Sequence, residues 1–185
     1  TQENIVGSLS SSQESLLLWL SLFIVLAALI KSAQFPFSSW LPRAMEGPSS
    51  SSSIFYGSLA VHLGIFLLLR TFPLWSHDYF IRGLLVAVGL ISAISGTLIS
   101  RVQSGVKSQL AYSTVVQIGF MLMELGFGLN GFVLFHVVGH SFLRAYQFLV
   151  SPSVLSYLSH HMIFHFKPRV KVLRSNFLER IHSAI

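Results

Sequence analysis

Apolar residues in this chain form long continuous runs, not the spaced stripes of an amphipathic helix or the alternation of a half-buried strand. A membrane-spanning helix needs about 20 predominantly apolar residues to cross the hydrocarbon core. The runs therefore predict about five membrane-spanning helices. We expect these helices at residues 15–32, 54–70, 81–100, 106–128 and 132–150.

Prolines mark two places where the helical pattern is expected to stop. The first run continues through Lys31 to Pro36. A proline ring removes a backbone donor and clashes with the preceding turn, so a broken helix is predicted around Pro36. The fifth span is expected to end at Ser151–Pro152. Beyond it we expect a short helix at 153–165 and a basic amphipathic segment at 166–185 that lies on the membrane surface.

Composition places this pattern in lipid. Hydrophobic residues make up 52% of the chain and charged residues only 10%, whereas a soluble domain carries about a quarter charged residues. The sequence therefore predicts an all-α, polytopic transmembrane helix bundle, with a membrane domain over residues 1–165. The first residue is Thr1, and a polar lead runs directly into a hydrophobic segment, so we expect the chain to be a piece of a longer protein.

The net charge of +6 would suggest nucleic-acid binding in a soluble protein. Here it favours a membrane surface, because five of the twelve Lys and Arg residues lie in the last twenty positions. These five are Lys167, Arg169, Lys171, Arg174 and Arg180. Cysteine is absent, which excludes disulfides and thiolate metal sites. We expect no nucleic-acid partner.

Ionisable residues inside the predicted spans are the candidate functional residues. Each costs about 2.5 to 3.5 kcal/mol on insertion scales, so its presence indicates a function or a partner. The candidates are Lys31, Lys107, Glu124, His136, His140 and Arg144.

The fifth span carries the most informative group. His136, His140 and Arg144 are spaced four apart and therefore share one helix face, over about 12 Å of helix. Histidine changes charge near physiological pH, so this polar ladder favours a proton pathway. The alternative is that the imidazoles only hold neighbouring helices together. A zinc site is disfavoured, because no carboxylate or cysteine accompanies the two histidines.

The other candidates are ambiguous from spacing alone. Lys31 precedes the predicted break and either takes part in proton exchange there or ends the span and reaches the surface. Lys107 stands at the start of its span. Glu124 is expected to pair with a basic group on another helix. His62, inside the second span, is expected to be a packing histidine.

Three stretches carry a resemblance to a known family. They run from Lys31 to Pro42 (KSAQFPFSSWLP), from Lys107 to Met121 (KSQLAYSTVVQIGFM) and from Leu134 to Ala145 (LFHVVGHSFLRA). In this order they closely resemble the antiporter-like subunits of respiratory complex I, an NADH:ubiquinone oxidoreductase, and most of all the type called subunit 5 in mitochondria and subunit L in bacteria.

The resemblance implies a function and residue roles. Such subunits carry a proton pathway near the bilayer midplane, built on broken helices with central lysines and linking histidines. Lys31 matches the central lysine, Lys107 the bridging lysine, and His136 and His140 the linking histidines. The resemblance implies that the chain is a non-catalytic subunit without cofactor or metal, in a mitochondrial inner or bacterial plasma membrane. Its partners would be other membrane subunits and lipids, and it would have no soluble substrate.

Several positions depart from the family pattern. Arg144 stands where the family usually has a lysine, and arginine does not deprotonate in proteins, so it can steer a proton but cannot carry one. Tyr56 replaces a usual histidine, with His62 further along the same helix, and Gly105 replaces a frequent aspartate. Glu124 lies where many members are apolar. These departures keep open a non-redox relative, namely a cation/proton antiporter or an inorganic-carbon uptake complex.

Length is the largest departure. Family members carry at least twice as many spans, including an upstream helix whose glutamate pairs with the central lysine and a second broken helix downstream. The resemblance therefore also leaves open a non-transporting structural remnant, in which the charges pair statically.

Overall fold

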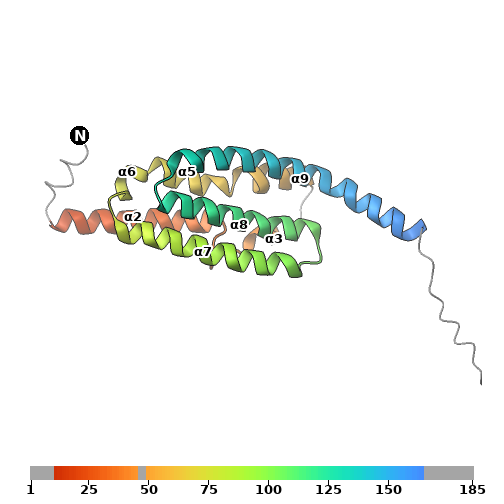
Figure 1. The fold of residues 1–185 in the computed structure, drawn as a ribbon, viewed down its shortest axis with the longest axis horizontal. Coiled ribbons are helices and arrows are strands. Elements are labelled where there is room, and N and C mark those ends of the chain that lie inside the picture. The colour runs from red at the N-terminus through yellow and green to blue at the C-terminus, as the bar shows by residue number, and fades with distance from the viewer. Residues whose placement is uncertain (1–10, 46–48, 165–185) are drawn as a thin grey trace, which may run out of the picture. The chain divides into compact units, whose positions relative to one another are not determined.

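The computed structural model describes residues 11–45 and 49–164, which form helices and turns without a β-strand (Figure 1). The all-helical fold predicted from the sequence is confirmed over these residues, and the predicted surface segment at 166–185 lies outside them. The helices are α2 (Ser11–Lys31), α3 (Trp40–Ala44), α4 (Ser49–Ser51), the π-helix η1 (Ser52–Leu59), α5 (His62–Arg70), α6 (Phe72–Trp75), α7 (Tyr79–Val102), α8 (Val106–Gly126) and α9 (Asn130–Phe164).

The chain divides into two compact units, residues 1–152 and 153–185. The helix bundle belongs to the first unit, and the described part of the second unit, residues 153–164, is helical. The predicted helix end at Ser151–Pro152 is wrong, because α9 continues through Pro152 to Phe164. A proline inside a helix removes a single backbone hydrogen bond, which neighbouring groups in a membrane protein can replace.

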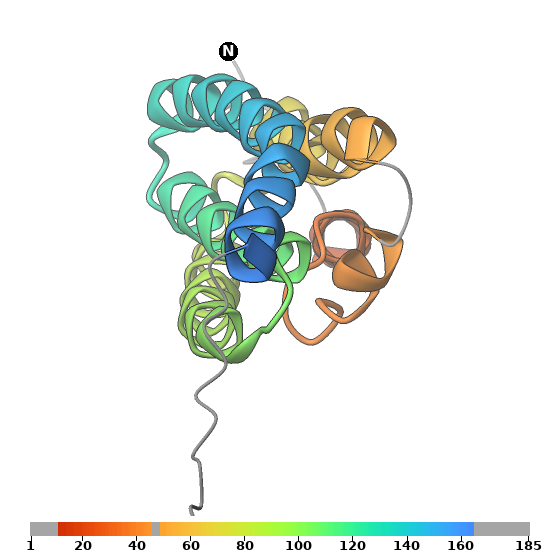
Figure 2. The same cartoon turned by 90° about the vertical axis from the view of Figure 1, so that its right-hand side faces the viewer.

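Close packing joins α7 to α8, which lie antiparallel and side by side (Figures 1 and 2). A Cβ atom added to Gly89 would lie 2.5 Å from the carbonyl oxygen of Gly119, and one added to Gly119 would lie 2.7 Å from the carbonyl oxygen of Gly89. Backbone therefore faces backbone at this crossing. Small residues allow this approach between helices in lipid, where dispersion contacts drive association.

Replacing Gly119 by leucine is expected to destabilise the bundle by about 1–3 kcal/mol, because the obstructing atom is backbone and cannot rotate away. Thermal unfolding of the solubilised native assembly measures this loss. The matched control is Gly83→Leu on α7, since a Cβ at Gly83 meets nothing within 4 Å. Equal melting temperatures for the two variants would contradict the packing argument.

A left-handed residue ends α2 before Pro36 is reached. Ala33 has φ of 53°, and its N–H donates to the carbonyl of Ile30 at 3.2 Å, while the N–H of Gln34 donates to the carbonyl of Leu29 at 3.0 Å. This pair of bonds is a Schellman motif, in which a residue other than glycine costs about 1–2 kcal/mol. The Trp40 indole N–H donates to the same Ile30 carbonyl at 3.1 Å, so the helix end is capped from α3.

The non-helical segment between α2 and α3 is fastened to α7 and α8. The backbone N–H of Phe35 donates to the Ser92 hydroxyl oxygen of α7 at 3.0 Å. The Gln34 amide donates to the carbonyl of Val115 on α8 at 3.4 Å. Non-helical backbone leaves polar groups without intrahelical partners, and these two bonds supply partners for some of them.

Serine hydroxyls attach η1 to α9. Ser53 Oγ donates to the carbonyl of Ala145 at 2.9 Å, and Ser58 Oγ donates to the carbonyl of Ser141 at 3.0 Å. Wide π-helical turns of this kind are rare and occur often at functional sites. The helical segment that contains the predicted span at 54–70 begins earlier than expected, inside the serine run, and Ser53 and Ser58 bind α9.

Many large apolar side chains of the first unit are exposed, whereas some of its polar, ionisable side chains are buried. Phe135 and Phe142 are 80% and 75% exposed, whereas His140 and Arg144 are each 6% exposed. Within the described residues, the segments Ser52–Arg70 and Tyr79–Val102 are long and apolar enough to cross a membrane, and Ser15–Lys31 is a shorter apolar helix. Large exposed apolar surfaces mark contact with lipid or with other proteins.

Candidate functional site

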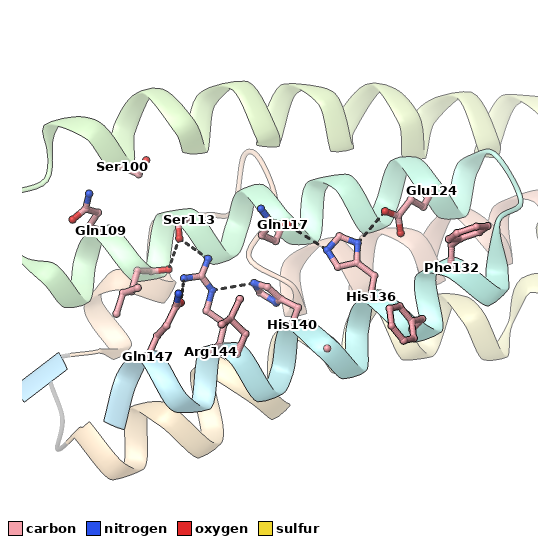
Figure 3. Close-up of a pocket in the computed structure, with 14 residues that line it drawn as sticks. Ser100, Gln109, Ser113, Gln117, Glu124, Phe132, His136, His140, Arg144 and Gln147 are labelled. Atoms are coloured by element: carbon pink, nitrogen blue, oxygen red, sulfur yellow. Dashed lines mark hydrogen bonds and ion pairs between the residues drawn. The ribbon is translucent and has the colours of Figure 1, made fainter. Parts of the chain in front are cut away.

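A cavity of about 880 Å³ lies along α8 and α9 and carries most of the predicted residues (Figure 3). Its polar walls come mainly from α8 (Gln109, Ser113, Gln117, Glu124) and α9 (His136, His140, Arg144, Gln147), with Ser100 from α7. The α8 positions Ser113, Gln117 and Glu124 are four and seven residues apart, so they share one face of that helix. The predicted ladder on α9 faces this stripe.

Glu124 and His136 form a hydrogen-bonded pair at one end of the cavity. Oε1 of Glu124 lies 2.9 Å from Nδ1 of His136, and Oε1 of Gln117 lies 3.2 Å from Nε2 of His136. The predicted basic partner of Glu124 is thus a histidine. The two side chains are 28% and 25% exposed, so the pair is accessible from the cavity.

This pair can hold one exchangeable proton in two places. With Oε1 of Gln117 facing Nε2 of His136, the ring donates from Nε2. The proton between His136 and Glu124 then sits either on Nδ1, giving an imidazolium and a carboxylate, or on the carboxyl, giving two neutral groups. Both arrangements keep the same heavy-atom contacts, so the proton can move without rearranging the site.

Arg144 occupies the other end of the cavity and spreads its guanidinium over three acceptors. Its Nε donates to Nε2 of His140 at 3.0 Å, one terminal nitrogen donates to Oε1 of Gln147 at 2.7 Å, and the other donates to Oγ of Ser113 at 2.5 Å. An arginine keeps its charge in proteins and offers only donors, so Nε2 of His140 must be an acceptor here.

A residue that sequence reasoning took for packing joins this end of the site. Nε2 of His62, on α5, lies 3.0 Å from Nδ1 of His140, and the ring centroids are 5.2 Å apart. The only sequence signal was indirect: the family histidine usual near position 56 is Tyr56 here, and His62 follows six residues later in the same predicted span.

The ladder of three residues spaced four apart divides into two clusters. The rings of His136 and His140 are 6.2 Å apart by centroid and perpendicular. Both nitrogens of His136 face α8, while those of His140 face His62 and Arg144. Spacing on α9 correctly placed the three residues on one face. The partners on α8 and α5 assign them to separate clusters.

The two predicted lysines lie apart from the cavity walls. Lys31 is the last residue of α2, and its side chain is exposed on this chain. Lys107 is in the first turn of α8, ten residues before Gln117, which corresponds to about 15 Å along the helix. The structure therefore brings together Glu124, His136, His140 and Arg144, and leaves the lysines outside this group.

Comparison with known proteins gives consistent matches. Residues 3–167 match the model of the family described as NADH:quinone oxidoreductase/Mrp antiporter, transmembrane. A probable inorganic carbon transporter subunit DabB2 of Halothiobacillus neapolitanus is 45% identical over 135 residues, which cover 73% of this chain and 24% of that protein. The chloroplastic NAD(P)H-quinone oxidoreductase subunit 5 of Marchantia polymorpha is 42% identical over 135 residues, covering 73% of this chain and 20% of the relative.

The subunit 5 of Poa pratensis is 43% identical over 142 residues, which cover 76% of this chain and 20% of the relative. The chain thus spans a fifth to a quarter of the length of these curated relatives. The family match and the outward apolar surface agree that the protein is embedded in a membrane. The chain belongs to the NADH:quinone oxidoreductase/Mrp antiporter transmembrane family.

Proposed function

We propose that this chain carries part of a proton pathway through the membrane, as part of an antiporter-like subunit of an NADH:quinone oxidoreductase. The observation that carries the proposal is the Glu124–His136 pair, in which Oε1 of Glu124 lies 2.9 Å from Nδ1 of His136 and both side chains line a cavity of about 880 Å³. Ionisable residues at membrane depth mark ion and proton pathways.

The other predicted residues extend this pathway. His140 would be its next histidine, and Arg144 would act as a fixed positive charge that orients His140 without carrying a proton. Lys31 and Lys107 would exchange protons with groups on other helices of the whole protein. The end of α2 at Lys31 and the start of α3 at Trp40 support a single discontinuous membrane helix around Pro36.

The same proposal covers topology and partners. Residues 1–165 would form a multi-pass membrane domain with residues 166–185 on the membrane surface, in a mitochondrial inner or bacterial plasma membrane. The partners would be lipids and the other membrane subunits of a large complex. The names of the relatives, which describe subunits of a quinone oxidoreductase and of a transporter, support this assembly.

Replacing Glu124 by glutamine tests the proposal, because glutamine keeps the shape but cannot take up the proton shared with His136. Proton translocation by the native assembly in sealed vesicles, followed with a pH-sensitive dye, should fall by about a hundredfold or more. Asp78→Asn, at the start of α7 and away from the cavity, should leave it unchanged. Full translocation by assembled Glu124→Gln protein would refute the pathway role, and a loss of assembly alone would support a structural remnant.

A second candidate function is inorganic-carbon uptake by a non-redox relative. It is favoured by the 45% identity to a probable inorganic carbon transporter subunit and by Arg144, Glu124 and Gly105, which depart from the complex I pattern. Purifying the native complex and recording its absorbance separates the two functions. Flavin and iron–sulfur bands would favour the oxidoreductase, and their absence from an intact complex would favour the carbon transporter.

A further inference from the structure

His62, His140 and Arg144 form a buried chain that leads from the cavity into the bundle. His140 and Arg144 line the cavity, whereas His62 lies behind them on α5. The three side chains are 4%, 6% and 6% exposed, respectively. Each contact along the chain is a hydrogen bond of 3.0 Å between two nitrogen atoms. The proposed pathway through His136 and His140 does not use His62.

Arg144 determines where the protons of this chain sit. Because Nε of Arg144 donates to Nε2 of His140, that nitrogen carries no hydrogen. A neutral His140 then has its hydrogen on Nδ1, which faces Nε2 of His62. Nε2 of His62 is therefore the acceptor, and the hydrogen of a neutral His62 is on Nδ1. When both rings are neutral, His140 and His62 therefore carry their hydrogen on Nδ1, and the hydrogen bond from Arg144 determines this arrangement.

The far nitrogen of His62 is left ready to release a proton. Nδ1 of His62 is buried and makes no well-formed hydrogen bond, although the backbone of Ser58, four residues earlier, is close enough to interact with the ring. Unpaired buried donors are rare and costly, so they call for a functional or structural explanation. The charged and titratable groups that surround the pair are Arg144, next to His140, and His136, whose ring centroid is 6.2 Å from that of His140.

We propose that His62 is a proton-relay residue, which receives the Nδ1 proton of His140 and passes its own Nδ1 proton onward to water. The inference rests on the proposed proton pathway. In the relay step, Arg144 moves off Nε2 of His140, and this nitrogen binds a proton from water in the cavity. The Nδ1 hydrogen of His140 transfers to Nε2 of His62, and the Nδ1 hydrogen of His62 leaves. One proton enters, one leaves, and both rings stay neutral as Nε2–H tautomers.

The relayed state excludes the resting position of Arg144. After the step, Nε2 of His140 carries a hydrogen, and it would meet the Nε hydrogen of Arg144, donor against donor. Arg144 can therefore return to Nε2 of His140 only after that nitrogen has lost its hydrogen. It is a positioning residue, because its hydrogen bond sets the starting tautomer of the histidine pair.

Two substitutions of His62 separate a relay from a structural role. In His62→Gln, the amide oxygen can still accept the Nδ1 hydrogen of His140, but the amide cannot relay a proton. In His62→Leu, both abilities are lost. Translocation by the native assembly is measured in sealed vesicles, with assembly checked by the amount of chain in the purified complex. His77→Gln, in the loop before α7, is the matched control.

A relay predicts that assembled His62→Gln protein loses translocation at least tenfold, while His77→Gln keeps it. Translocation by His62→Gln at the wild-type rate overturns the relay and leaves the proposed pathway standing. Absence of translocation by the wild-type assembly instead refutes the proposed function. If His62→Gln fails to assemble, ¹⁵N spectra of the histidine-labelled wild-type assembly decide: Nδ1–H signals for both rings support the relay, and an Nε2–H signal from His140 overturns it.

Discussion

Replacing Arg144 by leucine is expected to destabilise the bundle more than any other single change of a charged side chain. The substitution leaves three acceptors without their donor, on His140, Gln147 and Ser113. An unsatisfied buried polar group costs about 1–3 kcal/mol. Thermal unfolding of the purified native assembly, together with the yield of assembled chain, measures the effect.

A lysine at this position is expected to recover only part of the loss. Lys keeps the positive charge, but its compact ammonium cannot hold the three acceptors in the geometry of a planar guanidinium. The matched control is Arg101→Leu, because Arg101 lies in the last turn of α7 with an exposed side chain. A melting temperature of Arg144→Leu as high as that of Arg101→Leu would show that the buried network contributes little.

The sequence correctly predicted which residues share one face of α9, but it could not predict which side chains of other helices contact that face. A spacing of four residues aligned His136, His140 and Arg144, and they do line one cavity. Spacing on one helix carries no information on which neighbouring helix supplies a partner. Gln117 on α8 and His62 on α5 therefore could not be assigned to their histidines. Because of these two partners, His136 and His140 belong to separate hydrogen-bonded clusters.

Helix ends show a similar limit. The break after the first helix was expected from Pro36, and the backbone instead turns at Ala33, a residue with no intrinsic preference for the left-handed region. Pro152, read as a stop, lies within α9. Proline and alanine propensities describe isolated helices, whereas capping by Trp40 and the bond from Phe35 to Ser92 come from distant segments.

The second large effect is expected at the Glu124–His136 pair, where we predict that two single substitutions and their combination are equivalent. His136→Gln should lower proton translocation by about a hundredfold or more, the range lost when a proton-transferring group is removed. Glu124→Gln should have the same effect. One proton is shared between Nδ1 of His136 and Oε1 of Glu124, so losing either end stops the transfer.

The double variant tests whether the pair acts as a unit. Because the first substitution already removes the shared proton, the second should cost almost nothing more, and the coupling energy of the double-mutant cycle should match the loss from either single change. Gln109→Ala, on the wall of the same cavity, controls for altered cavity shape. If the loss in the double variant equals the product of the two single losses, Glu124 and His136 act independently, and the shared-proton description of this site is wrong.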